Sequence, residues 1–259
     1  MRFLMILFLL FLNLQANIIE AKYHVSYGIF GEIGVVKTRL KTHDKSYIIS
    51  IEANTTGFAR SLSGQRDEFF QSKGSIENGV LKPKIYTHTV TRMKRKNSFI
   101  MNPSQWESAL SKKVKTMKFF DNFVLEERQK FFDGKLTSKS SKRLKYYAQN
   151  DLLSVFFNFK KLSNDYNITK LTKFYAVGAK NENGELLVLP MSQDRQREIF
   201  ENVSGHNFIV FVNQPIFSSE KGELFVKINK DDIADEAILK DVLFFGDIRA
   251  KLVWKNIVK

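Results

Sequence analysis

Turn dipeptides spaced along the chain constrain its fold more than any other feature. Asn78-Gly79, Asp133-Gly134 and Asn183-Gly184 each separate stretches that are rich in apolar and β-forming residues. Tight hairpin turns need residues that tolerate positive φ, and Asn, Asp and Gly are the residues that do so. The pattern predicts three hairpins, which pair 71–77 with 80–86, 123–132 with 135–136, and 174–179 with 185–189.

Alternating apolar residues add further strands to this framework. Val, Ile, Tyr, Phe or Thr recur at close to every second position in 23–30, 34–40, 47–54, 208–212 and 223–228. This period of two is typical of strands. We therefore expect a mainly β protein, built as a curved antiparallel sheet or a partly closed barrel with two or three short helices.

Helical patterns are fewer and short. Ser104-Gln-Trp-Glu107 matches a capping box before Ala109 and Leu110, and Asp151 is placed to cap a helix over 152–159. A third helix is predicted over 232–243, although residues 242–245 could equally form a strand.

Phenylalanine supplies 24 residues and occurs in doublets. The doublets are 69–70, 119–120, 131–132, 156–157 and 244–245. Adjacent side chains on a strand point to opposite faces, so doublets on strands require both faces to be covered. A helix layer, closure of the barrel or an apolar ligand in a concavity would each provide that cover.

The N-terminus has the three-part plan of a signal peptide. Met1-Arg2 is positive, residues 3–12 are an unbroken apolar run, and more polar sequence follows. We interpret residues 1–21 as the signal peptide, with cleavage after Ala21, and 22–259 as one periplasmic β-rich domain. Cleavage after Ala16 and an uncleaved N-terminal anchor are the alternatives.

Cysteine usage and charge narrow the compartment and the class of partner. The chain has no Cys, which is unusual for a secreted eukaryotic domain and fits a bacterial periplasm. Its formal net charge of +14 predicts contact with anionic lipid, lipopolysaccharide or acidic glycan, and with membrane only peripherally, rather than with nucleic acid. A coding bias toward Lys, Asn, Ile and Phe would explain the same charge without a function.

No catalytic or cofactor motif is present in the sequence. The four histidines show no metal-binding spacing, and no nucleophile elbow, P-loop or kinase motif occurs. Gly28, Gly31 and Gly34 fit a hairpin or bulge better than a nucleotide loop. We therefore expect a protein that is not an enzyme and carries neither a metal nor a cofactor.

Arg60 and Arg66 are the candidate ligand-binding residues. They lie in the glycine-punctuated stretch 57–67, where two guanidinium groups could hold a phosphate or a carboxylate. Pairing with Asp67 or Glu68 is the alternative. Further basic clusters at 92–96, 112–115 and 139–145 would form a patch only if the fold brought them together.

Asn-x-Ser/Thr triplets begin at Asn54, Asn167 and Asn202. The first two also carry an acidic residue two positions earlier, as in the longer acceptor motif of bacterial periplasmic N-glycosylation. Asn167 and, less strongly, Asn54 are predicted glycosylation sites.

Several segments together resemble a family of exported Gram-negative proteins that is known only as a domain of unknown function. The segments are 23–27, 47–51 leading to Gly57, 74–86, 151–154 and 222–228. The resemblance implies a periplasmic, β-rich single domain, similar in outline to envelope carrier half-barrels, and brings no established catalytic residues. In such a pattern Asp151 and Ser154 cap a helix.

These features predict a non-enzymatic periplasmic binding or envelope-maintenance protein that engages an amphipathic or anionic component such as lipid or glycan. The alternative is a structural module that docks an envelope protein complex. An apolar cavity rimmed by Arg or Lys would favour binding, and a flat exposed apolar patch over a filled interior would favour docking.

Overall fold

The computed structural model describes residues 17–95, 108–178, 183–211, 222–242 and 246–258, and it shows a mainly β protein. The first run of elements is β1 (Asn17–Tyr27), η2 (Gly28–Phe30), β2 (Glu32–His43), β3 (Ser46–Thr55), α2 (Gly57–Leu62), β4 (Asp67–Glu77), β5 (Val80–Arg95), β6 (Ser108–Phe119), β7 (Val124–Phe132) and β8 (Lys135–Arg143). The second run is α3 (Leu152–Leu162), β9 (Thr172–Tyr175), β10 (Glu185–Pro190), α4 (Gln193–Ile199), β11 (His206–Phe211), β12 (Glu223–Ile228), β13 (Ala234–Val242) and β14 (Gly246–Val258).

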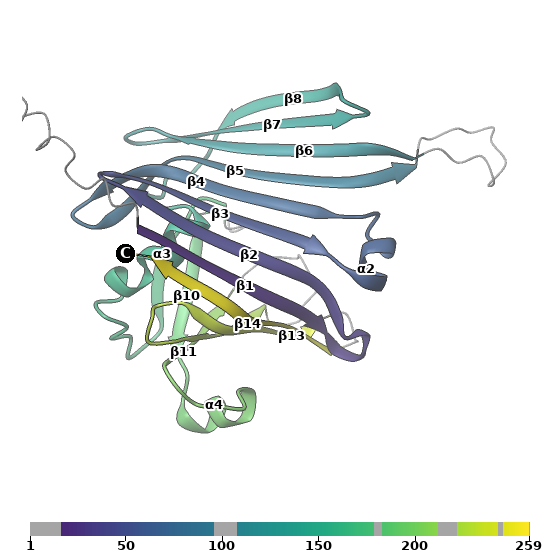
Figure 1. Cartoon of the computed structure of the whole chain (residues 1–259). Helices are drawn as coiled ribbons and strands as arrows, with labels where there is room; N and C mark the ends of the chain where they lie inside the picture. The colour runs from purple at the N-terminus through teal and green to yellow at the C-terminus, as the bar shows by residue number, and fades with distance from the viewer. Residues whose placement is uncertain (1–16, 96–107, 179–182, 212–221, 243–245, 259) are drawn as a thin grey trace, which may run out of the picture.

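The 14 strands of the described residues form one antiparallel sheet, which does not close into a barrel within that part of the chain. Each run is a meander of neighbours in sequence, and the pairing of β1 with β14 joins the two runs. The strands β8 and β9 therefore stand at the two ends of the sheet order. Figure 1 shows the sheet curling, with α3 on the face toward which it curls. We call this the inner face.

The predicted turn dipeptides lie between paired strands. Asn78 and Gly79 join β4 to β5 with φ of 51° and 70°, and Asp133 and Gly134 join β7 to β8 with φ of 52° and 75°. These positive values match a type I′ turn, whose twist suits the flanking strands. The third dipeptide, at 183–184, lies at the end of a longer connection between β9 and β10.

The interior consists of two main apolar clusters on either side of α3. Val155 and Phe159 pack with β9 to β12, whereas Leu153 packs with Tyr47, Tyr86 and other side chains of the first meander. A single helix thus fills the curl of the sheet. No helix among the described residues has the length and apolar character that crossing a membrane requires.

The helix predicted over 232–243 is wrong, because Ala234–Val242 form strand β13 between β12 and β14. Ala234, Glu236 and Ile238 are buried at alternate positions, so burial follows the strand period. The helix predicted at 104–110 begins outside the described residues, and Ala109 and Leu110 lie in β6. The short helices α2 and α4 were not predicted from the sequence.

Candidate binding site

A buried carboxylate fixes the start of α3. Asp151 is the N-cap of the helix, and its Oδ1 accepts hydrogen bonds from the backbone N–H of Leu153 and of Ser154, both at 2.8 Å. The Ser154 hydroxyl accepts from the Asp151 N–H at 2.9 Å and completes the capping box. Ser72 of β4 donates to Asp151 Oδ2 at 2.5 Å, which ties the cap to the sheet.

Asn158, one turn after Ser154, fastens the helix to β5. Its side-chain oxygen accepts from the Leu81 N–H at 2.8 Å, and its Nδ2 donates to the Leu81 carbonyl at 2.9 Å. The amide thus satisfies both backbone groups of one strand residue that would otherwise be buried without partners. Two polar anchors therefore hold α3 on one side, and its apolar side faces β9 to β12.

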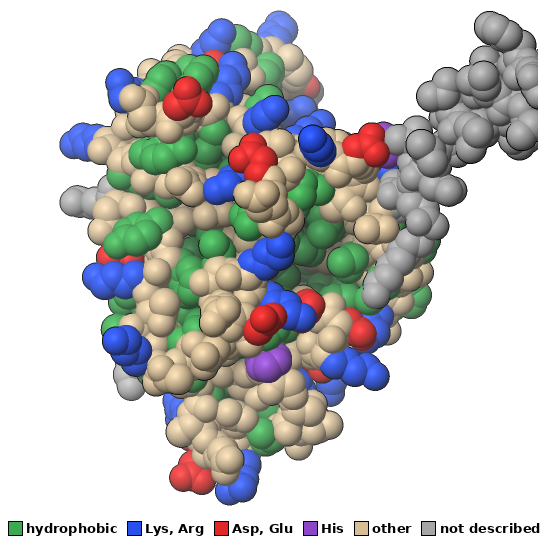
Figure 2. Space-filling view, turned by 90° about the vertical axis from the view of Figure 1, so that its left-hand side faces the viewer, with side chains coloured by type: hydrophobic (Ala, Val, Ile, Leu, Met, Phe, Trp, Pro, Cys, Tyr) green, Lys and Arg blue, Asp and Glu red, His purple; other side chains and the backbone are tan. Residues whose placement is uncertain are grey.

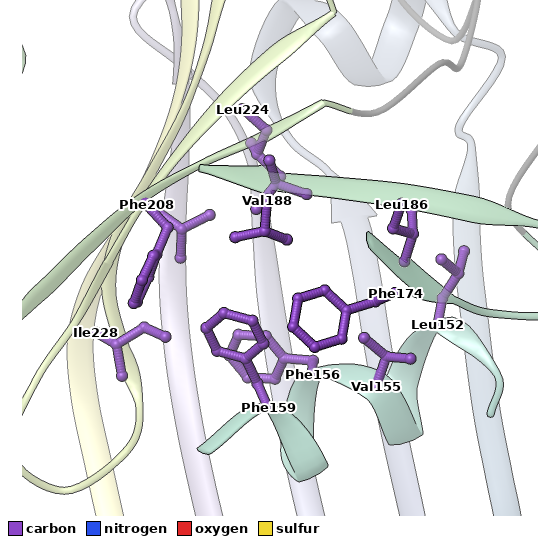
Figure 3. Close-up of a pocket in the computed structure, with 12 residues that line it drawn as sticks. Leu152, Val155, Phe156, Phe159, Phe174, Leu186, Val188, Phe208, Leu224 and Ile228 are labelled. Atoms are coloured by element: carbon purple, nitrogen blue, oxygen red, sulfur yellow. The ribbon is translucent and has the colours of Figure 1, made fainter. Parts of the chain in front are cut away.

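An apolar cavity of about 250 Å³ lies between α3 and the strands β9 to β12. Its lining is Leu152, Val155, Phe156, Phe159, Phe174, Leu186, Val188, Phe208, Val210, Leu224, Val226 and Ile228. The strand residues come from alternate positions of neighbouring strands, and their side chains converge on the helix in Figure 3. This lining consists of apolar side chains alone and contains no titratable group.

Aromatic rings form the floor of the cavity. The Phe159 ring meets Phe208 edge to face at 5.1 Å between centroids and Phe174 at 5.5 Å. These are favourable arrangements for aromatic rings. Phe156, which is 38% exposed, lines the cavity from the solvent side of α3. The Phe156–Phe157 doublet therefore belongs to a helix and not to a strand.

Arg60 lies in α2 and Arg66 lies just before β4, and each has an acidic partner. The partners Asp67 and Glu68 are adjacent residues of β4 and point to opposite faces of the sheet, so the structure does not bring the two guanidinium groups together. Arg60 pairs with Asp67 at 3.0 Å, and Arg66 pairs with Glu68 at 2.6 Å. His88 of β5 meets the other oxygen of Glu68 at 2.6 Å. Burial acts to raise the pKa of Glu68, but the contacts with His88 and Arg66 outweigh it and hold the pKa below its ordinary value.

A second hollow of about 410 Å³ lies next to the pair of Arg66 and Glu68. Val25, Val36 and Ala53 on the inner face of β1 to β3 line it, together with Arg66 and Glu68. Arg66 thus borders an apolar surface, although it does not border the cavity under α3. The two hollows are separate features of one curved sheet.

The basic clusters of the sequence are divided among the faces and the edge of the sheet. Alternate residues of β5 and β6 place Arg92, Lys94 and Lys113 on the inner face, whereas Lys112 points the opposite way. The cluster at 139–145 begins in the exposed edge strand β8.

The remaining predicted positions lie in well-defined local structure. Asn54 is exposed on β3 and donates to Asp67 at 3.1 Å, and Asn167 is exposed in the turn after α3. Ala21 is buried in the middle of β1, opposite Thr38 of β2 and Lys255 of β14. Of the predicted signal peptide, residues 1–16 lie outside the described residues.

Histidine and carboxylate side chains do not gather into a metal-binding group within the part of the chain that the structure describes. His88 stacks on Phe70 with ring centroids 4.1 Å apart. His24 contacts Glu32 at 2.9 Å between their side-chain atoms. These contacts are those of structural histidines.

The cavity residues were missed in the sequence because they come from a helix and four strands spread over some 75 positions of the chain. Each strand carries only one to three of them. Apolar alternation identified β11 and β12 as strands, but it did not indicate that their inner faces would leave a space against α3. Only the placement of the helix defines the site.

No protein-family model matches the chain. No curated protein matches it in sequence. Among solved structures, the chain is similar to a beta-barrel-like protein of the domain of unknown function DUF1849 from Brucella abortus, with a TM-score of 0.49 and 12% sequence identity. The match covers 94% of this chain and 98% of that one.

Proposed function

We propose that this protein is a non-enzymatic binding protein of the bacterial periplasm that holds the apolar part of an amphipathic or anionic envelope component, such as a lipid or glycolipid. The cavity between α3 and the strands β9 to β12 carries the proposal, because its lining is entirely apolar and about 250 Å³ accommodates a segment of hydrocarbon chain. An ordinary core would fill such a space with side chains.

One face of the molecule has surface features that suit an amphipathic ligand. Figure 2 shows apolar side chains in a hollow of this face, with Lys and Arg as well as Asp and Glu side chains around it. Apolar surface beside cations suits a molecule with a hydrocarbon part and an anionic part.

Native mass spectrometry of the protein purified gently from its own host tests the proposal. We expect a reproducible lipid or glycolipid mass that disappears on denaturation. A ligand-free mass, under conditions that preserve known carrier–lipid complexes, would contradict it.

Two substitutions locate the ligand in the cavity. Val210→Trp places a large side chain in the space under α3, and Val253→Trp is a control at an exposed position of β14. We expect the first variant to lose the bound mass and the second to retain it. Phe156→Gln, on the solvent side of the helix, provides a weaker second test without overpacking the core.

Docking to an envelope protein complex is a second candidate function, favoured by Trp254. This side chain is 51% exposed and borders a polar hollow with Lys22, Lys37 and Glu52. Exposed Trp beside charged groups is typical of interface anchors. Trp254→Ser should abolish capture of a partner complex if this function is correct, and should leave ligand mass unchanged.

A further inference from the structure

Four basic side chains form a group on the inner face of the first meander. Arg92 and Lys94 come from β5, Lys113 from β6 and Lys130 from β7. We call this group the basic strip. Lys113 lies directly opposite Lys130, and Val90 lies opposite Lys113 on its other side.

The strip shares its face with the core. Tyr86 of β5 is 2% exposed in the cluster that packs on α3, and Arg92 lies six residues further along the same strand without an intervening bulge. Residues an even number apart on a strand point the same way. The strip therefore continues the inner face beyond the region that α3 covers.

The opposite face of β5 is neutral over this length. Thr87, Thr89 and Thr91 occupy the outer positions, between the inner basic and apolar ones. A general excess of lysine in the coding sequence would place cations on the solvated outer face at least as often. The alternation of β5 instead places Arg92 and Lys94 on the inner face.

The cations of the strip have no acidic partner among the described residues. The nearby carboxylates are already engaged, Glu68 by Arg66 and His88, and Glu126 by Arg128 at 2.7 Å. Partial burial, together with the charges of Arg92, Lys94 and Lys130, lowers the pKa of Lys113. Like charges directly opposite each other across strands destabilise a sheet, and a bound anion would relieve that repulsion.

The spacing of the strip suits more than one anionic group. Side chains on one face recur about 5 Å apart across strands and about 7 Å apart along a strand, which is the scale of two linked phosphates. Next to the strip, Val90 lies opposite Glu68, which Arg66 and His88 hold, and on the other side of Glu68 lies Ala53, in the hollow that Val36 also lines. The cations and the apolar hollow thus lie on one concave face, with the Glu68 ion pairs between them.

We propose that the basic strip binds the diphosphate headgroup of a single amphiphile, whose apolar part lies along the inner face of the sheet. The inference rests on the proposed function only in taking the ligand to be amphipathic. Because the strip lies inside a curve, it suits one extracted molecule better than a flat bilayer surface. Both phosphates would accept hydrogen bonds from the Lys and Arg groups.

The test measures binding of geranylgeranyl diphosphate to the whole protein by calorimetry, with geranylgeraniol and inorganic pyrophosphate as matched probes. The strip variant is Lys113→Gln/Lys130→Gln. The control is Lys112→Gln/Lys139→Gln, which removes the same charge from exposed positions outside the strip. We expect the strip variant to bind geranylgeranyl diphosphate at least about tenfold more weakly and the control to bind it unchanged.

Equal loss in both variants would overturn the proposal, because affinity would then follow net charge alone. Pyrophosphate binding as tight as that of geranylgeranyl diphosphate would contradict an amphipathic ligand and indicate that the strip binds a free anion. Geranylgeraniol has no phosphate, so it tests the cavity under α3 without the basic strip. Its affinity should be the same in all variants. If it fails to bind while the strip still governs diphosphate binding, the cavity proposal fails and the strip stands.

Discussion

At the scale of single residues, the attachment of α3 to the sheet depends on buried polar groups whose partners the fold supplies. Asp151 is fully buried, and its carboxylate accepts hydrogen bonds from two backbone N–H groups and from Ser72. Burial raises the pKa of Asp151, and the hydrogen bonds oppose that rise without cancelling it. The folded protein therefore holds this proton more tightly than the unfolded chain does.

This difference predicts how stability depends on pH. A raised pKa in the folded state adds stability that is complete below the ordinary carboxyl value of about 3.9 and is lost as pH rises through the folded value. Asp151→Asn keeps the capping oxygen but has no proton to lose. Urea unfolding should show the wild type losing stability relative to this variant as pH rises. A constant difference, or the same trend in the exposed control Asp121→Asn, would contradict the assignment.

Asn158 gives a second prediction at this scale. Asn158→Leu keeps the branched shape of the side chain but leaves the N–H and the carbonyl of Leu81 buried without partners. We expect the free energy of unfolding to fall by about 2–4 kcal/mol. Asn122→Leu, in the exposed turn between β6 and β7, is the control and should change it little. Denaturant titration distinguishes the two variants. A loss of stability no larger than that of the control would contradict a stabilising role of the hydrogen bonds between Asn158 and Leu81.

At the scale of elements, β1 connects the two meanders, because it pairs with β2 on one side and β14 on the other. Its first half, 17–21, contains the buried Ala21 and also Ile19, which packs against both main clusters. Cleavage after Ala21 would remove this half of the strand, whereas cleavage after Ala16 would leave β1 whole.

We therefore predict that, if a signal peptide is removed, the mature chain begins at Asn17 and not at Lys22, which N-terminal sequencing of the native protein would determine. A chain starting at Lys22 should be less stable than one starting at Asn17 by roughly 3 kcal/mol or more, because it loses ladder hydrogen bonds on both sides and apolar burial. Equal melting temperatures for the two chains would refute this role of the first five residues.

The strands were predictable where local chemistry and tertiary structure agree. Asn-Gly and Asp-Gly turns set the first two hairpins, and alternation located β12 at 223–228. Prediction failed at β13, where helix-forming residues are held as a strand by pairing on both sides. The position of Arg66 in a loop was readable, and its pairing with Glu68 was one of the alternatives, but the contact of His88 with the same carboxylate depends on strand register. The cavity depends on the distance of α3 from the sheet, which no local pattern encodes.

At the scale of the whole molecule, the two ends of the sheet are protected in different ways. β8 is exposed throughout and carries Lys135, Lys139 and Lys142, and β9 has only four residues. Lysine on an edge strand opposes pairing with a second chain, and a short strand offers little to pair with. The protein can therefore keep an open sheet without aggregating.

Replacing the edge lysines tests this protection. We expect Lys135→Thr/Lys139→Thr/Lys142→Thr to associate with itself in a concentration-dependent manner, as measured by sedimentation velocity. The control Lys37→Thr/Lys41→Thr/Lys112→Thr removes the same charge from strands that have neighbours on both sides. Association of both variants would trace the effect to net charge and contradict a specific role of the edge.

The separation of β8 from β9 in the sheet order has a mechanical consequence. A closed barrel has a circumference fixed by its strand number and stagger, so it can widen only by breaking ladder bonds. An open sheet can widen by small changes in the twist between neighbouring strands, and the hydrogen bonds between the strands stay intact. The curl of this sheet can therefore widen or narrow without loss of the hydrogen bonds between neighbouring strands.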